Sequence, residues 1–72
     1  MKPFAELDVV QLRQAHSEHN LGVGARGTVV LVYAQGEAYE VEFVRSDGQT
    51  AAVLTLPATE VAAVAHPLQQ AA

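Results

Sequence analysis

The densest group of side chains that could bind a metal is His16-Ser17-Glu18-His19. Two histidines three residues apart can share one face of a helical turn, and the glutamate between them could add an oxygen ligand. A catalytic zinc site needs three protein ligands held in place by surrounding hydrogen bonds. This group falls in a stretch that predicts a loop, with no third ligand fixed nearby, so we expect solvated loop histidines and no metal or other cofactor.

Glu40 and Glu42 are two residues apart on one predicted strand and could be considered as an acid/base pair. Two carboxylates take separate catalytic roles only where their environments differ. Glutamates at alternate positions of one strand share an environment, which is typical of a solvated face. Ser17 and Ser46 lie in loop and turn contexts without the strand-turn-helix motif of a nucleophilic serine. We therefore expect no catalytic residues and no enzymatic activity.

The segment Gly22-Val23-Gly24-Ala25-Arg26-Gly27 has glycines at the intervals of a dinucleotide-binding loop. That fingerprint must follow a strand and open a helix. Here a predicted strand follows instead, so we expect Gly24 and Gly27 to let the chain turn tightly into that strand.

Composition limits the partners that the chain can have. Its 72 residues suffice for one domain and include no cysteine, which favours a cytoplasmic protein without disulfides. The net charge is −4, and the four basic residues are scattered, so the clustered cations of a nucleic-acid-binding surface are missing. No apolar run has the length of a signal peptide or a membrane span. A protein partner with a basic surface fits this charge better than nucleic acid or a membrane.

Short strands separated by turn signals must position these side chains. The strands are expected at residues 7–13, 27–33, 38–44, 49–56 and 61–64. Residues 14–26 form the longest connection, and long ordered loops often carry function. Residues 38–44 alternate strictly, which predicts that Tyr39, Val41 and Phe43 face the core while Glu40 and Glu42 face outward.

Two hairpin turns fix the register. A three-residue loop at residues 34–36, with glycine in the left-handed region, would pair Leu31 with Tyr39 and Val29 with Val41. Val30 and Val32 would then lie on the outer face beside Glu40 and Ala38, either covered by another segment or forming an exposed apolar strip.

A two-residue loop at Asp47-Gly48 would set Ala52, Leu54 and Leu56 against Phe43, Val41 and Tyr39.

After Pro57, which cannot donate to a strand ladder, residues 58–60 predict a single helical turn before the last strand. A helix over residues 58–65 is the competing interpretation, because alanine favours helices. The sequence thus predicts a small five-stranded all-β SH3-like barrel with a long first loop, a short helical turn before the last strand, one domain over residues 1–66 and a flexible tail over 67–72.

Three motifs also carry a family resemblance: Phe4-Ala5-Glu6-Leu7-Asp8-Val9-Val10, Gly24-Ala25-Arg26-Gly27-Thr28-Val29-Val30 and residues 36–43, followed by Thr55-Leu56-Pro57. The chain resembles a bacterial family of short domains of unknown function from about residue 4 to residue 64. The resemblance implies an SH3-like barrel with no established enzymatic activity, and an antitoxin-like or accessory role beside a small partner gene. The Gly24–Val30 segment is also similar to the KOW motif of ribosomal and transcription-elongation proteins.

The leading hypothesis is a non-enzymatic protein-binding module. The alternatives are a KOW-like nucleic-acid-associated domain and a homo-oligomeric structural module. The candidate partner-binding residues are the outward apolar and acidic positions of the second and third strands and the long first loop: Val30, Val32, Glu37, Glu40, Glu42, His16, His19 and Leu21.

Overall fold

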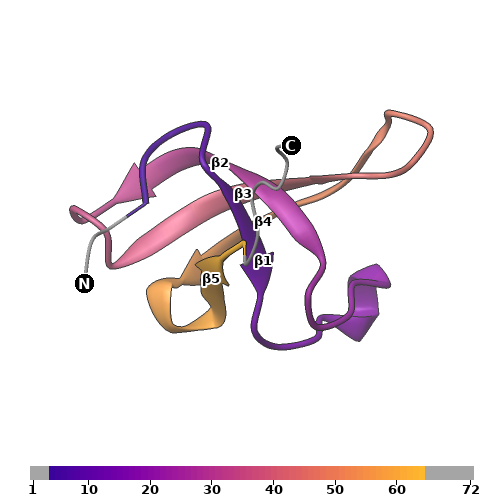
Figure 1. Cartoon of the computed structure of the whole chain (residues 1–72), viewed down its shortest axis with the longest axis horizontal. Coiled ribbons are helices and arrows are strands. Elements are labelled where there is room, and N and C mark those ends of the chain that lie inside the picture. The colour runs from indigo at the N-terminus through magenta and orange to yellow at the C-terminus, as the bar shows by residue number, and fades with distance from the viewer. Residues whose placement is uncertain (1–3, 65–72) are drawn as a thin grey trace, which may run out of the picture.

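The computed structural model describes residues 4–64, which form a single antiparallel sheet of five strands (Figure 1). The strands are β1 (Val9–Leu12), β2 (Arg26–Tyr33), β3 (Ala38–Val44), β4 (Thr50–Pro57) and β5 (Val61–Ala63). Their order across the sheet is β4-β3-β2-β1-β5. Two 3-10 turns, η1 (Ser17–His19) and η2 (Ala58–Glu60), are the helical elements of residues 4–64. The all-β prediction with five strands, a long first loop and a helical turn before the last strand is confirmed.

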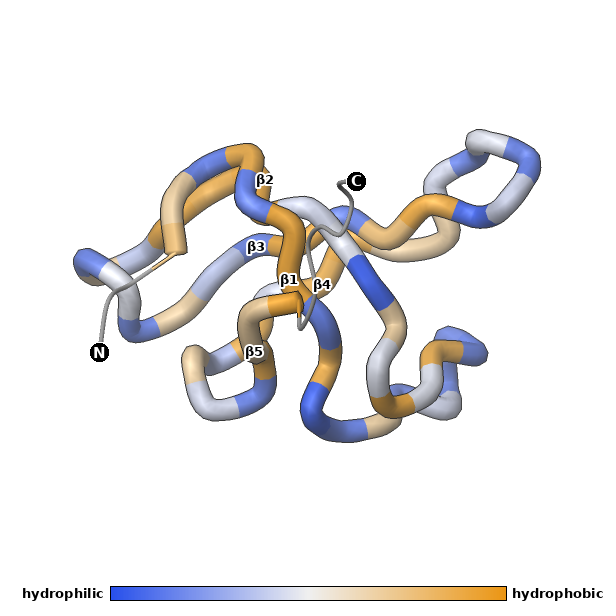
Figure 2. Tube along the Cα trace, in the orientation of Figure 1, coloured by the Kyte–Doolittle hydropathy of each residue, from blue (hydrophilic) through white to orange (hydrophobic). Residues whose placement is uncertain are grey.

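One face of the sheet carries the core. Tyr39, Val41 and Phe43 of β3 are buried at alternate positions, so the predicted alternation is confirmed. The remaining buried apolar side chains come from all the other strands: Val10, Leu12, Val29, Leu56 and Val61. Figure 2 shows how hydropathy varies along the chain, with polar residues frequent in the loops that project from the sheet.

The hairpin between β2 and β3 differs from the prediction at its tip. The turn contains four residues, Ala34–Glu37, and both Ala34 and Gln35 adopt positive φ (49° and 62°) in addition to Gly36. Leu31 therefore pairs with Glu40, and the predicted Leu31–Tyr39 pair is wrong. A β-bulge between Val29 and Leu31 then shifts the register by one residue, so that the predicted Val29–Val41 pair forms.

In the hairpin between β3 and β4, an irregularity in one strand likewise offsets a turn that is longer than predicted. Phe43, Val41 and Tyr39 pair with Ala52, Leu54 and Leu56 as predicted. The turn is nevertheless one residue longer than expected, because the Arg45 N–H donates to the Gln49 carbonyl (2.8 Å) and residues 46–48 form the loop. An irregularity in β4, where Val44 pairs with Thr50, restores the register.

The first strand is shorter than predicted because residues 5–8 form a turn. Leu7 has a φ of 76°, and the Asp8 N–H donates to the Ala5 carbonyl (3.0 Å). Further along, Gly24 (φ 90°) forms a turn at the end of the long loop, as predicted. Gly27 instead lies inside β2, opposite Val10. A side chain at this position would collide with Val41 and Phe43 of β3.

The last part of the described chain favours one of the two competing interpretations. Ala58–Glu60 form one 3-10 turn and Val61–Ala63 form a strand, so the helix over residues 58–65 is wrong. The predicted tail at 67–72 and the domain limit at residue 66 lie outside the described residues. Between residues 4 and 64 the structure contains no helix with the length and apolar character needed to cross a bilayer.

Candidate functional site

The bulge in β2 determines which side chains reach the surface. Two residues on a bulged strand oppose one residue on its partner, so the alternation of faces is interrupted there. Val30 and Leu31 are adjacent, yet both are exposed, with 39% and 41% of their surface accessible. Val32 packs partly buried against the core, so its predicted place on the outer face is wrong. Leu31 pairs with Glu40, which is the position that the sequence assigned to Val30, and Tyr33 pairs with Ala38, which was assigned to Val32.

We define the outer face as the surface of β2, β3 and β4 that points away from the core. It contains Val30, Leu31, Tyr33, Glu40, Glu42 and Val53. Leu31 pairs with Glu40 across the β2–β3 ladder, and Val53 pairs with Glu42 across the β3–β4 ladder. Each carboxylate thus has an exposed apolar residue directly beside it.

The two carboxylates of the outer face accept hydrogen bonds from neutral groups. The Tyr33 hydroxyl donates to Glu40 Oε1, and this contact raises the pKa of Tyr33, chiefly because ionisation of the hydroxyl would remove the hydrogen bond. The Thr50 hydroxyl donates to Glu42 Oε2 (2.7 Å). Within residues 4–64 the ion pairs belong to His16, and neither glutamate of the outer face contacts an arginine. Two negative charges on the outer face therefore lack a cationic partner in the described chain.

Glu37, another predicted site residue, is exposed in the β2–β3 turn rather than on a strand. Its backbone carbonyl accepts a hydrogen bond from the Ala58 N–H (3.0 Å), which joins the turn to η2. Glu37 extends the acidic character of this hairpin to its tip.

The structure separates the predicted loop residues from the outer face. The His16 ring lies between two glutamates, with Nε2 2.9 Å from Glu60 Oε1 and Nδ1 3.6 Å from Glu18 Oε2. Because a carboxylate only accepts, Nε2 carries the hydrogen of the shorter contact. A hydrogen bond from its own backbone lowers the pKa of Glu18, and His16 lowers it further. The contact between His16 and Glu60 joins the long loop to η2.

His19 and Leu21 line a hollow of about 650 Å³ between the long loop and the base of the β3–β4 hairpin, with Val44 and Arg45 opposite. His19 is exposed, while Leu21 packs partly against the core. Across residues 4–64, no three histidine, aspartate or glutamate side chains are arranged to hold a metal ion.

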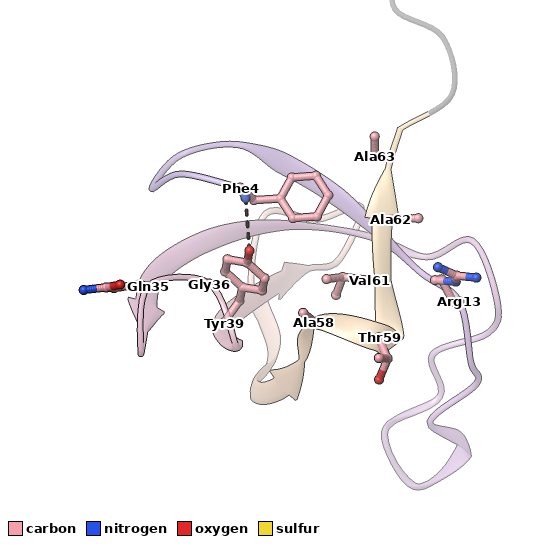
Figure 3. A pocket seen from close by; sticks show the side chains of 10 residues that line it. All are labelled: Phe4, Arg13, Gln35, Gly36, Tyr39, Ala58, Thr59, Val61, Ala62 and Ala63. Atoms are coloured by element: carbon pink, nitrogen blue, oxygen red, sulfur yellow. Dashed lines mark hydrogen bonds between the residues drawn. The ribbon is translucent and has the colours of Figure 1, made fainter. Parts of the chain in front are cut away.

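A larger hollow, about 760 Å³, lies beside β5 (Figure 3). Phe4, Tyr39 and Ala58 line one part of it, Val61–Ala63 run along it, and Arg13 lies at its far side. The Phe4 N–H donates to the Tyr39 hydroxyl (3.0 Å), and the two rings meet edge to face with centroids 5.6 Å apart. None of these residues was singled out as a binding residue from the sequence. The only signal was Phe4, which begins the first of the resemblance motifs.

Together, the fold and its surfaces define a small all-β domain with an acidic, partly apolar outer face and a separate hollow at the edge of its sheet. The family model of a domain of unknown function (DUF4926) matches residues 6–63, and the chain belongs to this family. Comparison with curated proteins and with solved structures finds no significant match.

Proposed function

We propose that this domain is a non-enzymatic protein-binding module whose outer face binds a partner protein with a basic surface. The observation that carries the proposal is the exposure of Leu31 and Val53 beside Glu40 and Glu42, which contact no arginine within residues 4–64. Exposed apolar side chains next to uncompensated charges are typical of a docking surface.

The charge of the outer face favours a different protein over a second copy of this chain. Pairing two outer faces would bring Glu40 and Glu42 of one copy against the same carboxylates of the other, and like charges in an interface cost free energy. Lysine or arginine side chains of a partner would form charge-assisted hydrogen bonds with these carboxylates. Leu31, Val30 and Val53 would supply the apolar contacts between them.

The absence of catalysis is part of the same proposal. A catalytic acid and base need different environments that separate their pKa values. Glu40 and Glu42 instead lie on the same face of the sheet, and each is hydrogen-bonded to a hydroxyl group. The strand order and the position of η2 support an SH3-like barrel. We further propose an antitoxin-like or accessory role in a bacterial two-gene locus, which rests on the family resemblance of the sequence.

The test uses charge reversal on the outer face. The double variant Glu40→Lys/Glu42→Lys should weaken binding of the partner about tenfold or more, because two attractive contacts become repulsive. The partner is first isolated by capture on the wild-type protein, with the product of the neighbouring gene as the first candidate, and its affinity is then measured by calorimetry with purified components. Binding should weaken as salt increases, because salt screens exposed charges.

A matched control separates the outer face from acidity in general. Glu6→Lys/Asp47→Lys changes the net charge equally, but at exposed positions outside the outer face. The proposal predicts normal binding by this control. Equal loss in both double variants, or no loss in either, would contradict the outer face as the binding surface. Light scattering over a dilution series that shows a stable homodimer sensitive to Leu31→Ser would assign the face to a second copy instead.

A further inference from the structure

Strand β5 lies at the edge of the sheet, since the order β4-β3-β2-β1-β5 gives it one neighbour, β1. In the described part of the chain, no strand pairs with its other side. An edge strand presents backbone N–H and C=O groups that can pair with another extended chain. Within β5, Val61 is buried, Ala62 is half-buried and Ala63 is exposed, so the strand becomes more accessible toward Ala63.

The register shows which backbone groups face outward. The Arg13 N–H donates to the Glu60 carbonyl (2.8 Å), and Gln11 pairs with Ala62 two residues further along the ladder. In an antiparallel ladder, alternate residues exchange both hydrogen bonds with the same neighbouring strand. Ala62 therefore points its N–H and C=O toward β1, whereas the Val61 C=O and the Ala63 N–H point to the open side.

The hollow beside β5 opens on this edge rather than on one face of the sheet. Val61, Ala62 and Ala63 all line it, although successive side chains of a strand point to opposite faces. On one face of the sheet, Val61 lines the hollow together with Phe4 and Tyr39. On the other, Arg13 lies across β5 from these rings (Figure 3).

The two sides of the edge differ in chemistry. Phe4 and Tyr39 offer an apolar aromatic wall, while Arg13 is exposed and takes part in none of the ion pairs of residues 4–64. A strand added to β5 would place adjacent side chains on opposite faces. One would meet the aromatic wall and the next would meet the guanidinium group, whose geometry suits a carboxylate.

We propose that the free edge of β5 binds an extended peptide that contains adjacent apolar and acidic residues. The peptide adds a sixth strand beside β5. One of its carbonyl groups accepts a hydrogen bond from the Ala63 N–H, and one of its N–H groups donates to the Val61 C=O. Its apolar side chain packs beside Phe4 and Tyr39, and its carboxylate pairs with Arg13. This site is separate from the outer face. It binds an acidic peptide, whereas the outer face is proposed to bind a basic surface.

The experiment uses an array of blocked, fluorescent hexapeptides in which one apolar residue alternates with either glutamate or lysine. Anisotropy with the full chain should show binding in the glutamate series and weaker binding in the lysine series. N-methylation of the peptide N–H that donates to the Val61 C=O should weaken binding about tenfold, as expected for one lost hydrogen bond. Ala63→Pro, which removes the donor at a position where an edge strand tolerates proline, should have a similar effect.

Arg13→Glu should reverse the preference, so that the lysine series binds better than the glutamate series. Arg45→Glu is its matched control, because Arg45 is an exposed arginine on the distant β3–β4 hairpin, and it should leave the preference unchanged. Glu40→Lys/Glu42→Lys should also bind the glutamate peptides, which separates this site from the outer face.

Hydrogen exchange at the Ala63 amide decides between the possible occupants of the edge. In the free protein this amide should exchange rapidly and become protected when a glutamate peptide is added. Protection in the peptide-free monomer would mean that the chain covers its own edge, and protection that grows with protein concentration would assign the edge to a second copy. Either result, or the absence of binding across the array, or binding that ignores both N-methylation and Arg13→Glu, would overturn the proposal.

Discussion

Replacing Gly27 by alanine would place a methyl group in β2 against three atoms of β3. A Cβ atom at this position would lie 2.6 Å from Val41 Cγ1, 2.9 Å from the Glu42 carbonyl oxygen and 2.9 Å from Phe43 Cδ1. All three separations are far below van der Waals contact. Val41 and Phe43 are buried, and the carbonyl belongs to the backbone of a central strand, so none of the three can move without disturbing the core.

The expected cost of Gly27→Ala is about 3 kcal/mol, at the upper end of the usual range for an overpacked core. A chain of this length should have a free energy of unfolding of about 4–10 kcal/mol, so the loss is a large fraction of the total. With a urea m-value of about 1 kcal/mol/M, the midpoint should fall by about 3 M. Circular dichroism during urea titration measures both quantities, and the m-value should stay close to that of the wild type.

Gly22→Ala is the matched control for this experiment. Nothing lies within 4 Å of the Cβ position at Gly22, and its backbone is not in the left-handed region. Removing backbone freedom from the unfolded chain should leave this variant as stable as the wild type or more stable by up to about 1 kcal/mol. If Gly27→Ala changed stability by less than about 0.5 kcal/mol, the close approach of β2 and β3 described above would be refuted.

Three further predictions concern single residues. Tyr39→Phe should lower the free energy of unfolding by about 1 kcal/mol, because the Phe4 N–H loses its acceptor; urea titration measures this, and an unchanged midpoint would contradict it. Gly48→Ala should cost about 1–2 kcal/mol in the same assay despite the open space around it, because its φ of 88° is unfavourable for a residue with a side chain; a neutral result would show that the turn relaxes. Tyr33 should ionise above the ordinary tyrosine pKa because of the Glu40 carboxylate, and Glu40→Gln should bring that pKa back down, as followed by NMR of the ring; identical titrations would rule out the contact. Since the folded state raises this pKa, the associated stabilisation is present below the unfolded-state value and is lost as pH rises through the folded-state value.

The inward face of β3 was predictable from sequence because its residues alternate strictly, whereas Leu31 and Val32 of β2 were assigned to the wrong faces. The turn lengths were not predictable, since the β2–β3 turn depends on Ala34 and Gln35 adopting positive φ, which neither residue type favours. An error of one residue in a turn would reverse every face of the strand. The fold avoids this reversal with an irregularity in each hairpin, one in β2 and one in β4, and neither leaves a clear signal in the sequence.

The candidate sites depended on tertiary structure to different degrees. Glu40 and Glu42 were placed correctly from alternation alone. Leu31 was missed because the bulge, not the local pattern, brings it to the surface. The hollow beside β5 could not be predicted because it joins the N-terminal Phe4 to Tyr39 and to Val61, which are adjacent only once the sheet has formed.

The bulge in β2 offers a second explanation for the exposed apolar residues of the outer face. It is needed to fit β2 to the core, whether or not the surface binds a partner. The inward positions of β2 are Gly27, Val29 and Val32, spaced by two and then by three residues, and the extra residue leaves Val30 and Leu31 exposed together. Exposure of Leu31 could therefore be a consequence of packing alone. Leu31→Thr keeps a residue suited to a strand while removing the apolar surface. If packing alone explains the exposure, this variant should bind the partner as the wild type does; if the outer face is the binding surface, stability should remain within about 0.5 kcal/mol while affinity falls.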